Sequence, residues 1–202
     1  MVGNTRTSLS RELILDETAK ILMVQGVANF RLKDLADQLE VTIPNIYRYF
    51  SSREDLISST FLYAYQNRAN YERARMVIPE KPWKNTSEFF DFIRAVVSDD
   101  DVGQEWLRML RIHALSATMF DSDASRQMRL IGRQLQDSLT SLFRAAQHQG
   151  LLHEGISAEA LSFITLSNRI GFSLTDALDG PAINEDEIWG IFQAGFELLA
   201  KN

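Results

Sequence analysis

The stretch from Leu32 to Ser51, LKDLADQLEVTIPNIYRYFS, constrains the fold more than any other part of the chain. It holds apolar residues at a spacing that lets two short helices share one seam, namely Leu35, Leu39, Val41 and Ile46. The small Ala36 lets the second helix approach the first. The pattern therefore predicts two short helices packed across a tight turn, which is a helix-turn-helix.

The second helix of this motif is expected to run from Ile43 to Phe50. Thr42 is a natural N-cap, and Pro44 fits the first turn, where a missing N–H leaves no helical hydrogen bond unmade. Such a helix presents polar side chains that suit phosphate oxygens and base edges. The predicted DNA-contacting residues are Lys33, Thr42, Pro44, Asn45, Tyr47, Arg48, Tyr49 and Arg53.

The residues IYRYF, followed by SSREDL, resemble the end of the DNA-binding domain of TetR-family transcriptional regulators. The resemblance covers roughly Ser10–Ile57 by motif, and the remaining chain only by length and helical pattern. It implies a homodimer, usually a repressor, that a small molecule releases from its DNA operator. The chain departs from the family pattern in having Phe30 and Arg31 in place of hydroxyl residues, and Arg53 in place of lysine.

A third departure concerns the turn of the motif, where Glu40 stands in place of the usual glycine. A turn that needs positive φ would cost a non-glycine residue about 1 kcal/mol.

The roles of the polar residues remain open at this level. Arg48 suits guanine and Asn45 suits adenine, or either side chain contacts only the DNA backbone. The resemblance favours Tyr47 as a phosphate contact; at least one of Tyr47 and Tyr49 should be exposed, because residues two apart on a helix cannot share a face. Arg53 either binds a phosphate docked at the start of its helix or is a solvated surface arginine.

Composition narrows the class of protein. The chain has 202 residues, of which 45% are hydrophobic and 24% charged, as in a soluble globular protein of one or two domains. It contains no apolar run near the ~20 residues of a membrane span, no signal-peptide core and no cysteine, so the cytoplasm is the expected compartment. No cofactor is expected, and the histidines lack the partners of a metal site.

The chain carries too little positive charge for a protein that coats nucleic acid non-specifically. The net charge is −6, and residues 1–55 carry seven basic and eight acidic side chains. Because phosphate attraction supplies most non-specific affinity, that affinity should be weak. Specific binding must then come from the placement of a few donors.

The whole chain is predicted to be all-α, with about nine helices and no strand alternation. The first helix is expected from Arg11 to Gln25, with Gly26 ending it, and Ser51 and Glu54 read as a capping box for a long helix that reaches about Arg75. The predicted domains are a helix-turn-helix domain over 1–52 and an effector-binding and dimerisation domain over 53–202.

The middle helices are rich in aromatic and methionine residues, which suits a pocket for an apolar or aromatic ligand. His113 is the predicted polar contact, and neither a strongly anionic nor a polyphosphate ligand is expected. The alternative is that these residues form ordinary core. The predicted ligand-binding set is Phe89, Ile93, Trp106, Met109, Leu110, His113 and Phe120.

The last two helices are predicted to form the dimer interface. Each carries an apolar stripe with a glycine, and a glycine within a helix costs about 1 kcal/mol relative to alanine, which suggests close helix approach. The alternative is core within one chain. The predicted interface residues are Leu161, Ile164, Gly171, Leu178, Ile188, Phe192, Gly195 and Leu199.

The sequence therefore predicts a ligand-responsive DNA-binding transcriptional regulator and not an enzyme. Two alternatives remain: an architectural DNA-binding protein without an effector, and a small-molecule enzyme with a vestigial helix-turn-helix. The absence of HExxH, GxSxG and a Gly-rich phosphate loop weakens the second alternative.

Overall fold

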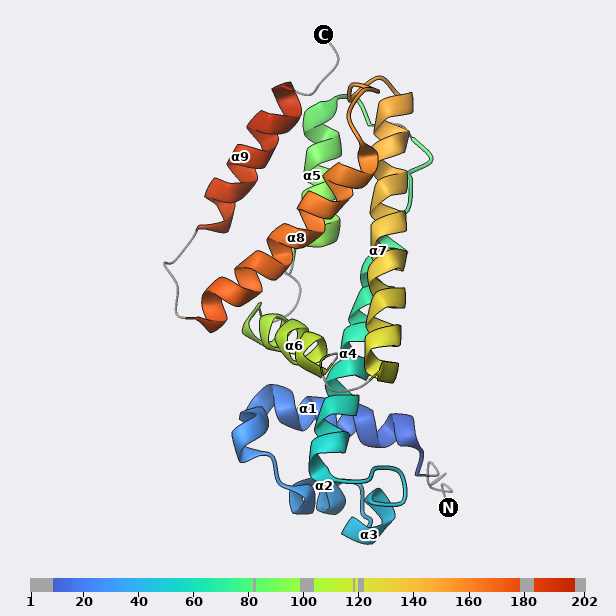
Figure 1. Cartoon of the computed structure of the whole chain (residues 1–202), viewed down its shortest axis with the longest axis vertical. Helices are drawn as coiled ribbons and strands as arrows, with labels where there is room; N and C mark the ends of the chain where they lie inside the picture. Colours follow the sequence, from blue (N-terminus) through green and yellow to red (C-terminus); the bar gives the residue numbers. More distant parts are fainter. Residues whose placement is uncertain are drawn as a thin grey trace, which may run out of the picture. The chain divides into compact units, whose positions relative to one another are not determined.

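The computed structural model describes residues 9–81, 83–98, 104–117, 119, 122–178 and 184–198, apart from the side chains of residues 104, 105, 176, 177 and 185. All regular secondary structure in these residues is helical (Figure 1), which confirms the predicted all-α fold. The helices are α1 (Arg11–Asn29), α2 (Leu32–Gln38), α3 (Ile43–Ile46), α4 (Arg53–Arg75), α5 (Thr86–Val97), α6 (Gln104–Ala117), α7 (Ser122–His148), α8 (Ala158–Ala177) and α9 (Glu185–Leu198).

The chain forms two compact units that divide within α4. The first unit ends at Tyr65 and the second begins at Gln66. The division falls inside the helix because Leu56, Ile57 and Phe61, in the first half of α4, are buried with the N-terminal core. One helix therefore belongs to both units.

In the N-terminal unit, α1 buries one face as its spacing predicts. Ile14, Thr18, Ile21 and Leu22 are all buried. The Thr18 hydroxyl is satisfied by donating to the Ile14 carbonyl oxygen at 2.7 Å. The regular path of the helix breaks at Gly26, whose φ of 71° suits a residue without Cβ, and a final turn continues to the end of α1.

The turn between α2 and α3 has a left-handed residue at Glu40, with φ of 53°. It is the one non-glycine residue with positive φ among the residues described. The Val41 N–H donates to the Ala36 carbonyl oxygen at 2.9 Å and closes the turn. Glu40 therefore stands at a position whose positive φ favours glycine, as the sequence analysis expected for this turn.

The start of α4 is capped by a different pair of residues from the one predicted. The Ser52 hydroxyl accepts from the Asp55 N–H at 3.0 Å, and the Asp55 carboxylate accepts from the Ser51 N–H at 2.7 Å. The predicted Ser51–Glu54 box is thus wrong by one residue. Both serines offer the same hydroxyl, and only the chain path into α4 decides which one occupies the capping position.

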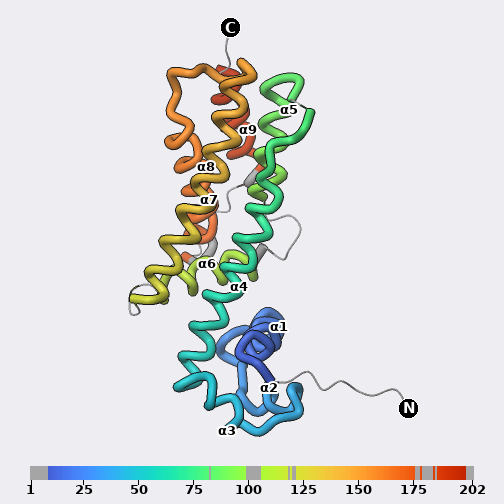
Figure 2. Tube along the Cα trace, turned by 90° about the vertical axis from the view of Figure 1, so that its right-hand side faces the viewer, coloured from blue at the N-terminus to red at the C-terminus, as the bar shows by residue number. Residues whose placement is uncertain are grey.

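The C-terminal unit is built around aromatic side chains from three helices. Phe89 of α5 packs edge-to-face on Phe143 of α7 at 5.6 Å, and Phe143 stacks on Phe196 of α9 at 5.7 Å. Helix α5 lies against α9, and α8 lies against both α7 and α6 (Figure 2). None of the helices, as far as their residues are described, is long and apolar enough to cross a membrane.

Candidate functional site

The helix-turn-helix is held together by a side chain predicted to contact DNA. The Asn45 side-chain oxygen accepts from the Thr42 N–H at 3.2 Å and from the Thr42 hydroxyl at 2.6 Å. Thr42 is the N-cap of α3, as predicted. The oxygen of Asn45 is therefore committed inside the motif, which gives this residue a structural role independent of any base.

Three other predicted contact residues lie on the surface of α2, α3 and the turn that follows. Lys33, Tyr47 and Arg48 are exposed, Tyr47 by 44% of its surface. Within the described residues, none of these three side chains makes a hydrogen bond or ion pair with the rest of the chain. Pro44 is exposed beside them. Two cations and a phenol are thus presented to solvent together on the motif.

Tyr49 is exposed, but its hydroxyl has a partner in the chain. It donates to the Leu9 carbonyl oxygen at 2.8 Å and so connects the end of the motif to the residues that precede α1. The hydrogen bond gives this tyrosine a structural role that Tyr47 lacks within the described chain.

Arg53 holds the end of α1. Its Nη2 donates to the carbonyl oxygens of Val27, at 2.9 Å, and Phe30, at 3.1 Å. Its guanidinium also lies 5.5 Å from the centre of the Phe30 ring. A cation at a helix C-terminus satisfies carbonyls that have no helical partner, so these contacts explain Arg53 without a phosphate.

The C-terminal unit buries a group of charges that joins α4 to α8. The Glu72 carboxylate accepts two hydrogen bonds from Arg169, at 2.8 and 2.6 Å, and one from Arg68 at 2.9 Å. The Glu72 side chain is only 3% exposed. Burial opposes its charge, but the hydrogen bonds from Arg169 and the charges of Arg169, Arg68 and Arg111 outweigh burial and hold the pKa of Glu72 below 4.5.

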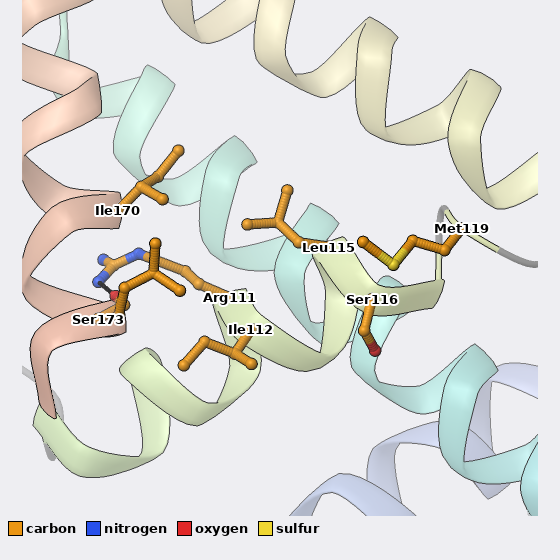
Figure 3. A pocket seen from close by; sticks show the side chains of 8 residues that line it. Arg111, Ile112, Leu115, Ser116, Met119, Ile170 and Ser173 are labelled. Carbon is orange, nitrogen blue, oxygen red and sulfur yellow. Dashed lines mark hydrogen bonds between the residues drawn. The ribbon is translucent and has the colours of Figure 1, made fainter. Parts of the chain in front are cut away.

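A cavity of about 220 Å³ lies between α6 and α8 (Figure 3). Arg111 reaches across it from α6, and its Nη1 lies 3.4 Å from the Ser173 hydroxyl of α8. The Arg111 residue is only 6% exposed. The residues that line this pocket are Arg111, Ile112, Leu115, Ser116, Met119, Ile170, Ser173 and Leu174.

The predicted ligand-binding residues do not line this pocket. Phe89, Ile93 and Leu110 are fully buried in the core, and Phe89 belongs to its aromatic cluster. Trp106, Met109 and His113 are half-buried on α6, and burial lowers the pKa of His113. Phe120 lies outside the described residues. A ligand-binding role for this set remains a prediction.

Sequence reasoning missed Arg111, although the sequence carries a signal for it. Leu107, Leu110, Arg111 and Ala114 are all buried and follow an i, i+3, i+4, i+7 spacing. An arginine inside a buried helical stripe needs a partner within the chain, because burying an unpaired charge is costly, and Ser173 is one such partner of Arg111. The sequence analysis read the neighbouring face, through Met109 and His113, as the wall of the pocket.

Helices α8 and α9 each expose an apolar face. Ile164 on α8 is 51% exposed and Leu178, just after α8, is 77% exposed, so these two predicted interface residues are not core of the single chain. Gly171 is also exposed, and Leu161 is half-buried. Phe163, Ile170 and Leu174 widen the exposed face.

On α9 the exposed face is offset by about one residue from the predicted stripe. Ile191 and Leu198 are the exposed apolar residues, whereas Ile188, Phe192 and Gly195 are half-buried. Leu199 lies outside the described residues. The reason is that α9 turns Trp189 and Phe196 into the aromatic core, which fixes the rotation of the helix about its axis.

Comparisons with known proteins find a family that matches the helix-turn-helix region and solved structures that share the fold. The model of a family described as "Bacterial regulatory proteins, tetR family" matches residues 14–60. No curated protein matches the chain.

Several solved structures share the fold over nearly the whole chain. A putative TetR-family transcriptional regulator from Mesorhizobium loti is 15% identical, with a TM-score of 0.67 and 94% of both chains covered. A putative transcriptional regulator from Saccharomonospora viridis, solved in complex with choline, is 14% identical, with a TM-score of 0.70 over 93% of this chain and 95% of that one. GusR of Salmonella enterica is 17% identical, with a TM-score of 0.60 and 94% of both chains covered.

Proposed function

From the match of residues 14–60 to the tetR family of bacterial regulatory proteins, we propose that this chain is a repressor that leaves its DNA operator when a small molecule binds. The observation that carries the proposal is the exposed group of Lys33, Tyr47 and Arg48 on the helix-turn-helix. Their donors suit phosphate oxygens and guanine edges. The site of action is operator DNA, and hence the cytoplasm.

We propose that the predicted DNA contacts fall into two groups, according to whether their side chains have partners within the chain. Lys33, Tyr47 and Arg48 are proposed as DNA contacts, with Thr42 and Pro44 exposed beside them. Asn45, Tyr49 and Arg53 already make hydrogen bonds within the unit and are proposed to support the reading surface. Tyr47 is the proposed phosphate contact and Arg48 the proposed base contact.

Fluorescence anisotropy with an operator selected from random DNA tests this division. Arg48→Ala should cost about 1–3 kcal/mol and relax the preference at one base pair. Tyr47→Phe should weaken all selected sites about equally, because it removes only the phenolic hydroxyl. Lys20→Ala, which removes an exposed cation of α1, is the matched control and should change little. Unchanged affinity in both Arg48→Ala and Tyr47→Phe would rule out this docking.

We further propose that the exposed faces of α8 and α9 pair with the same faces of a second copy. Two copies related by a two-fold axis present their reading helices to successive major grooves, about 34 Å apart, which requires a near-palindromic operator. Ile164, Leu174, Leu178, Ile191 and Leu198 supply apolar area for such an interface. The free protomer would otherwise leave this surface in water.

The glycines offer a sharp test of the interface. A Cβ built on Gly171 meets no atom within 4 Å in the protomer, and the same is true of Gly132 on α7. Gly171→Leu should therefore fold as well as Gly132→Leu, and only Gly171→Leu should shift sedimentation toward a monomer. A Gly171→Leu protein that stays dimeric would exclude close approach at this residue, and a monomeric wild type at micromolar concentration would exclude the dimer.

The proposed release mechanism is a shift between two conformations of the C-terminal unit. A ligand changes the population only by the difference between its affinities for the two states. The choline complex of the Saccharomonospora viridis protein supports small-molecule binding by this fold. An effector of the present chain should lower its affinity for operator DNA and leave the ligand-free affinity unchanged.

A further inference from the structure

The side-chain oxygen of Asn45 on α3 is fully used within the helix-turn-helix. It accepts from the Thr42 N–H at 3.2 Å and from the Thr42 hydroxyl at 2.6 Å. An amide oxygen has two lone pairs, so these two hydrogen bonds fill its accepting capacity. A backbone N–H can only donate, so the amide atom that faces it must be the oxygen, and this fixes the orientation of the side chain.

The side-chain nitrogen of Asn45, in contrast, makes no hydrogen bond within the described residues. It is also not one of the side-chain nitrogens that are buried without a hydrogen bond, so it reaches solvent. Both of its N–H groups are therefore available to a bound molecule. Asn45 presents donors, and no free acceptor, on the surface of the motif.

We propose that Asn45 reads guanine, and not adenine, in the major groove of operator DNA. The inference rests on the function proposed above, because it takes the motif to be the DNA-binding surface. It adds Asn45 to Arg48 as a residue that determines base preference, while the oxygen of Asn45 keeps its supporting role.

The reason for this preference is the pattern of donors and acceptors on the base edges. Adenine offers N7 as an acceptor and its N6 amino group as a donor, so an asparagine that pairs with both needs a free oxygen. Guanine offers two acceptors, N7 and O6, which suit the N–H groups of Asn45. Thymine offers one acceptor, O4, beside its methyl group. Guanine is therefore the base that the free donors of Asn45 match best.

Thr42 acts as a positioning residue in this proposal, through its hydroxyl. Thr42→Val keeps the shape of the side chain but removes the hydroxyl, which frees one lone pair of the Asn45 oxygen. The same asparagine can then accept from the amino group of adenine. Thr42→Ser keeps the hydroxyl and should restore the wild-type preference.

The test is selection of operators from random DNA by the full-length protein, followed by anisotropy titration of the selected site. The base pair that Asn45 reads is the one whose preference disappears in Asn45→Ala. Wild type should bind the site with guanine at that position about tenfold more tightly than the site with adenine. In Thr42→Val this ratio should fall to about twofold, since one further hydrogen bond to adenine becomes possible. In Thr42→Ser the ratio should stay near the wild-type value.

A ratio of affinities for two sites does not depend on the fraction of protein that is folded. The test therefore holds even if Asn45→Ala or Thr42→Val lowers stability. Three results would overturn the inference: adenine at the position that depends on Asn45, no position that depends on Asn45, as for a phosphate contact, or an unchanged ratio in Thr42→Val. An operator that requires Arg48 but gives one of these results would refute this inference alone, whereas failure to select any operator would refute the proposed function.

Discussion

Arg48 of the N-terminal unit and Arg169 of the C-terminal unit place the same side chain in opposite environments. Arg48 is exposed and makes no ion pair within the described residues, whereas the Arg169 side chain is only 10% exposed and binds both oxygens of Glu72. The first cation can bind a charged partner from outside the chain. The second already has one, and this ion pair joins α4 to α8.

The comparison shows that residue type alone does not identify a binding residue. What separates these arginines is the helix face on which each lies. Arg169 falls on the stripe of Ser162, Thr165 and Ser173, all buried. Glu72 of α4 falls between the buried Ala69 and the buried Met76, which follows the helix. Polar and charged residues on buried stripes form the internal network, while those on outward faces are available to a ligand or to DNA.

The largest expected effect comes from removing the charge of Glu72, the buried partner of Arg169. Glu72→Gln removes the carboxylate shared by Arg68 and Arg169 and should lower the free energy of unfolding by about 3–5 kcal/mol, because it leaves buried cations uncompensated. Glu54→Gln is the control, since the Glu54 side chain is 78% exposed and should matter by less than about 0.5 kcal/mol. Urea unfolding of both variants measures the difference. A loss below about 1 kcal/mol for Glu72→Gln would show that the buried charges are not coupled.

The stability lost in Glu72→Gln should also depend on pH. Hydrogen bonds and charges from the arginines lower the pKa of Glu72 in the folded protein, so folding favours the ionised carboxylate. Its contribution is fully present above the ordinary pKa of 4.5 and is lost as pH falls through the lower folded value. The stability difference between wild type and Glu72→Gln should be constant from pH 8 to about pH 6 and shrink below about pH 4.5. A difference that grew on acidification would contradict the assigned direction.

Arg53 and Arg48 of the N-terminal unit also differ in whether they have partners within the chain, and the expected effects of replacing them are smaller. Arg53→Ala removes two hydrogen bonds to the carbonyls that end α1 and should cost about 1.5–3 kcal/mol of stability, the range for bonds to a charged donor. Arg48→Ala should change stability by less than about 0.5 kcal/mol and act on DNA affinity instead. Thermal unfolding and anisotropy on both variants separate these effects. Equal stability losses would remove the distinction between a supporting and a reading arginine.

The smallest effect concerns the turn that orients the reading helix. Glu40 has positive φ, so Glu40→Gly should raise stability by about 1 kcal/mol. Asp37→Gly, at the end of α2, has no such strain to relieve and should lower stability by a similar amount. The two variants are compared by their urea midpoints. A destabilised Glu40→Gly would mean that the Glu40 side chain makes a contribution larger than the strain.

Much of the N-terminal unit was predictable because its determinants are local. The buried face of α1, the Thr42 cap and the special position of Glu40 each depend on residues within a turn or two of one another. The pair that caps α4 was not predictable, because two adjacent serines satisfy the same rule. The exposed apolar residues Ile191 and Leu198 of α9 lie one residue before members of the predicted interface stripe, because the packing of Trp189 and Phe196 sets the rotation of the helix; the interface itself stays a prediction.

The all-α class and the helix-turn-helix could be read from the sequence, because helical periodicity and capping act over short distances. Which charged residues are buried depends on how the helices pack. Glu72 and Arg169 lie far apart in the chain and meet only because the folded unit brings side chains of α4 and α8 within hydrogen-bonding distance. The pocket has the same origin, since Arg111 and Ser173 belong to different helices and become one polar site only when α6 lies against α8.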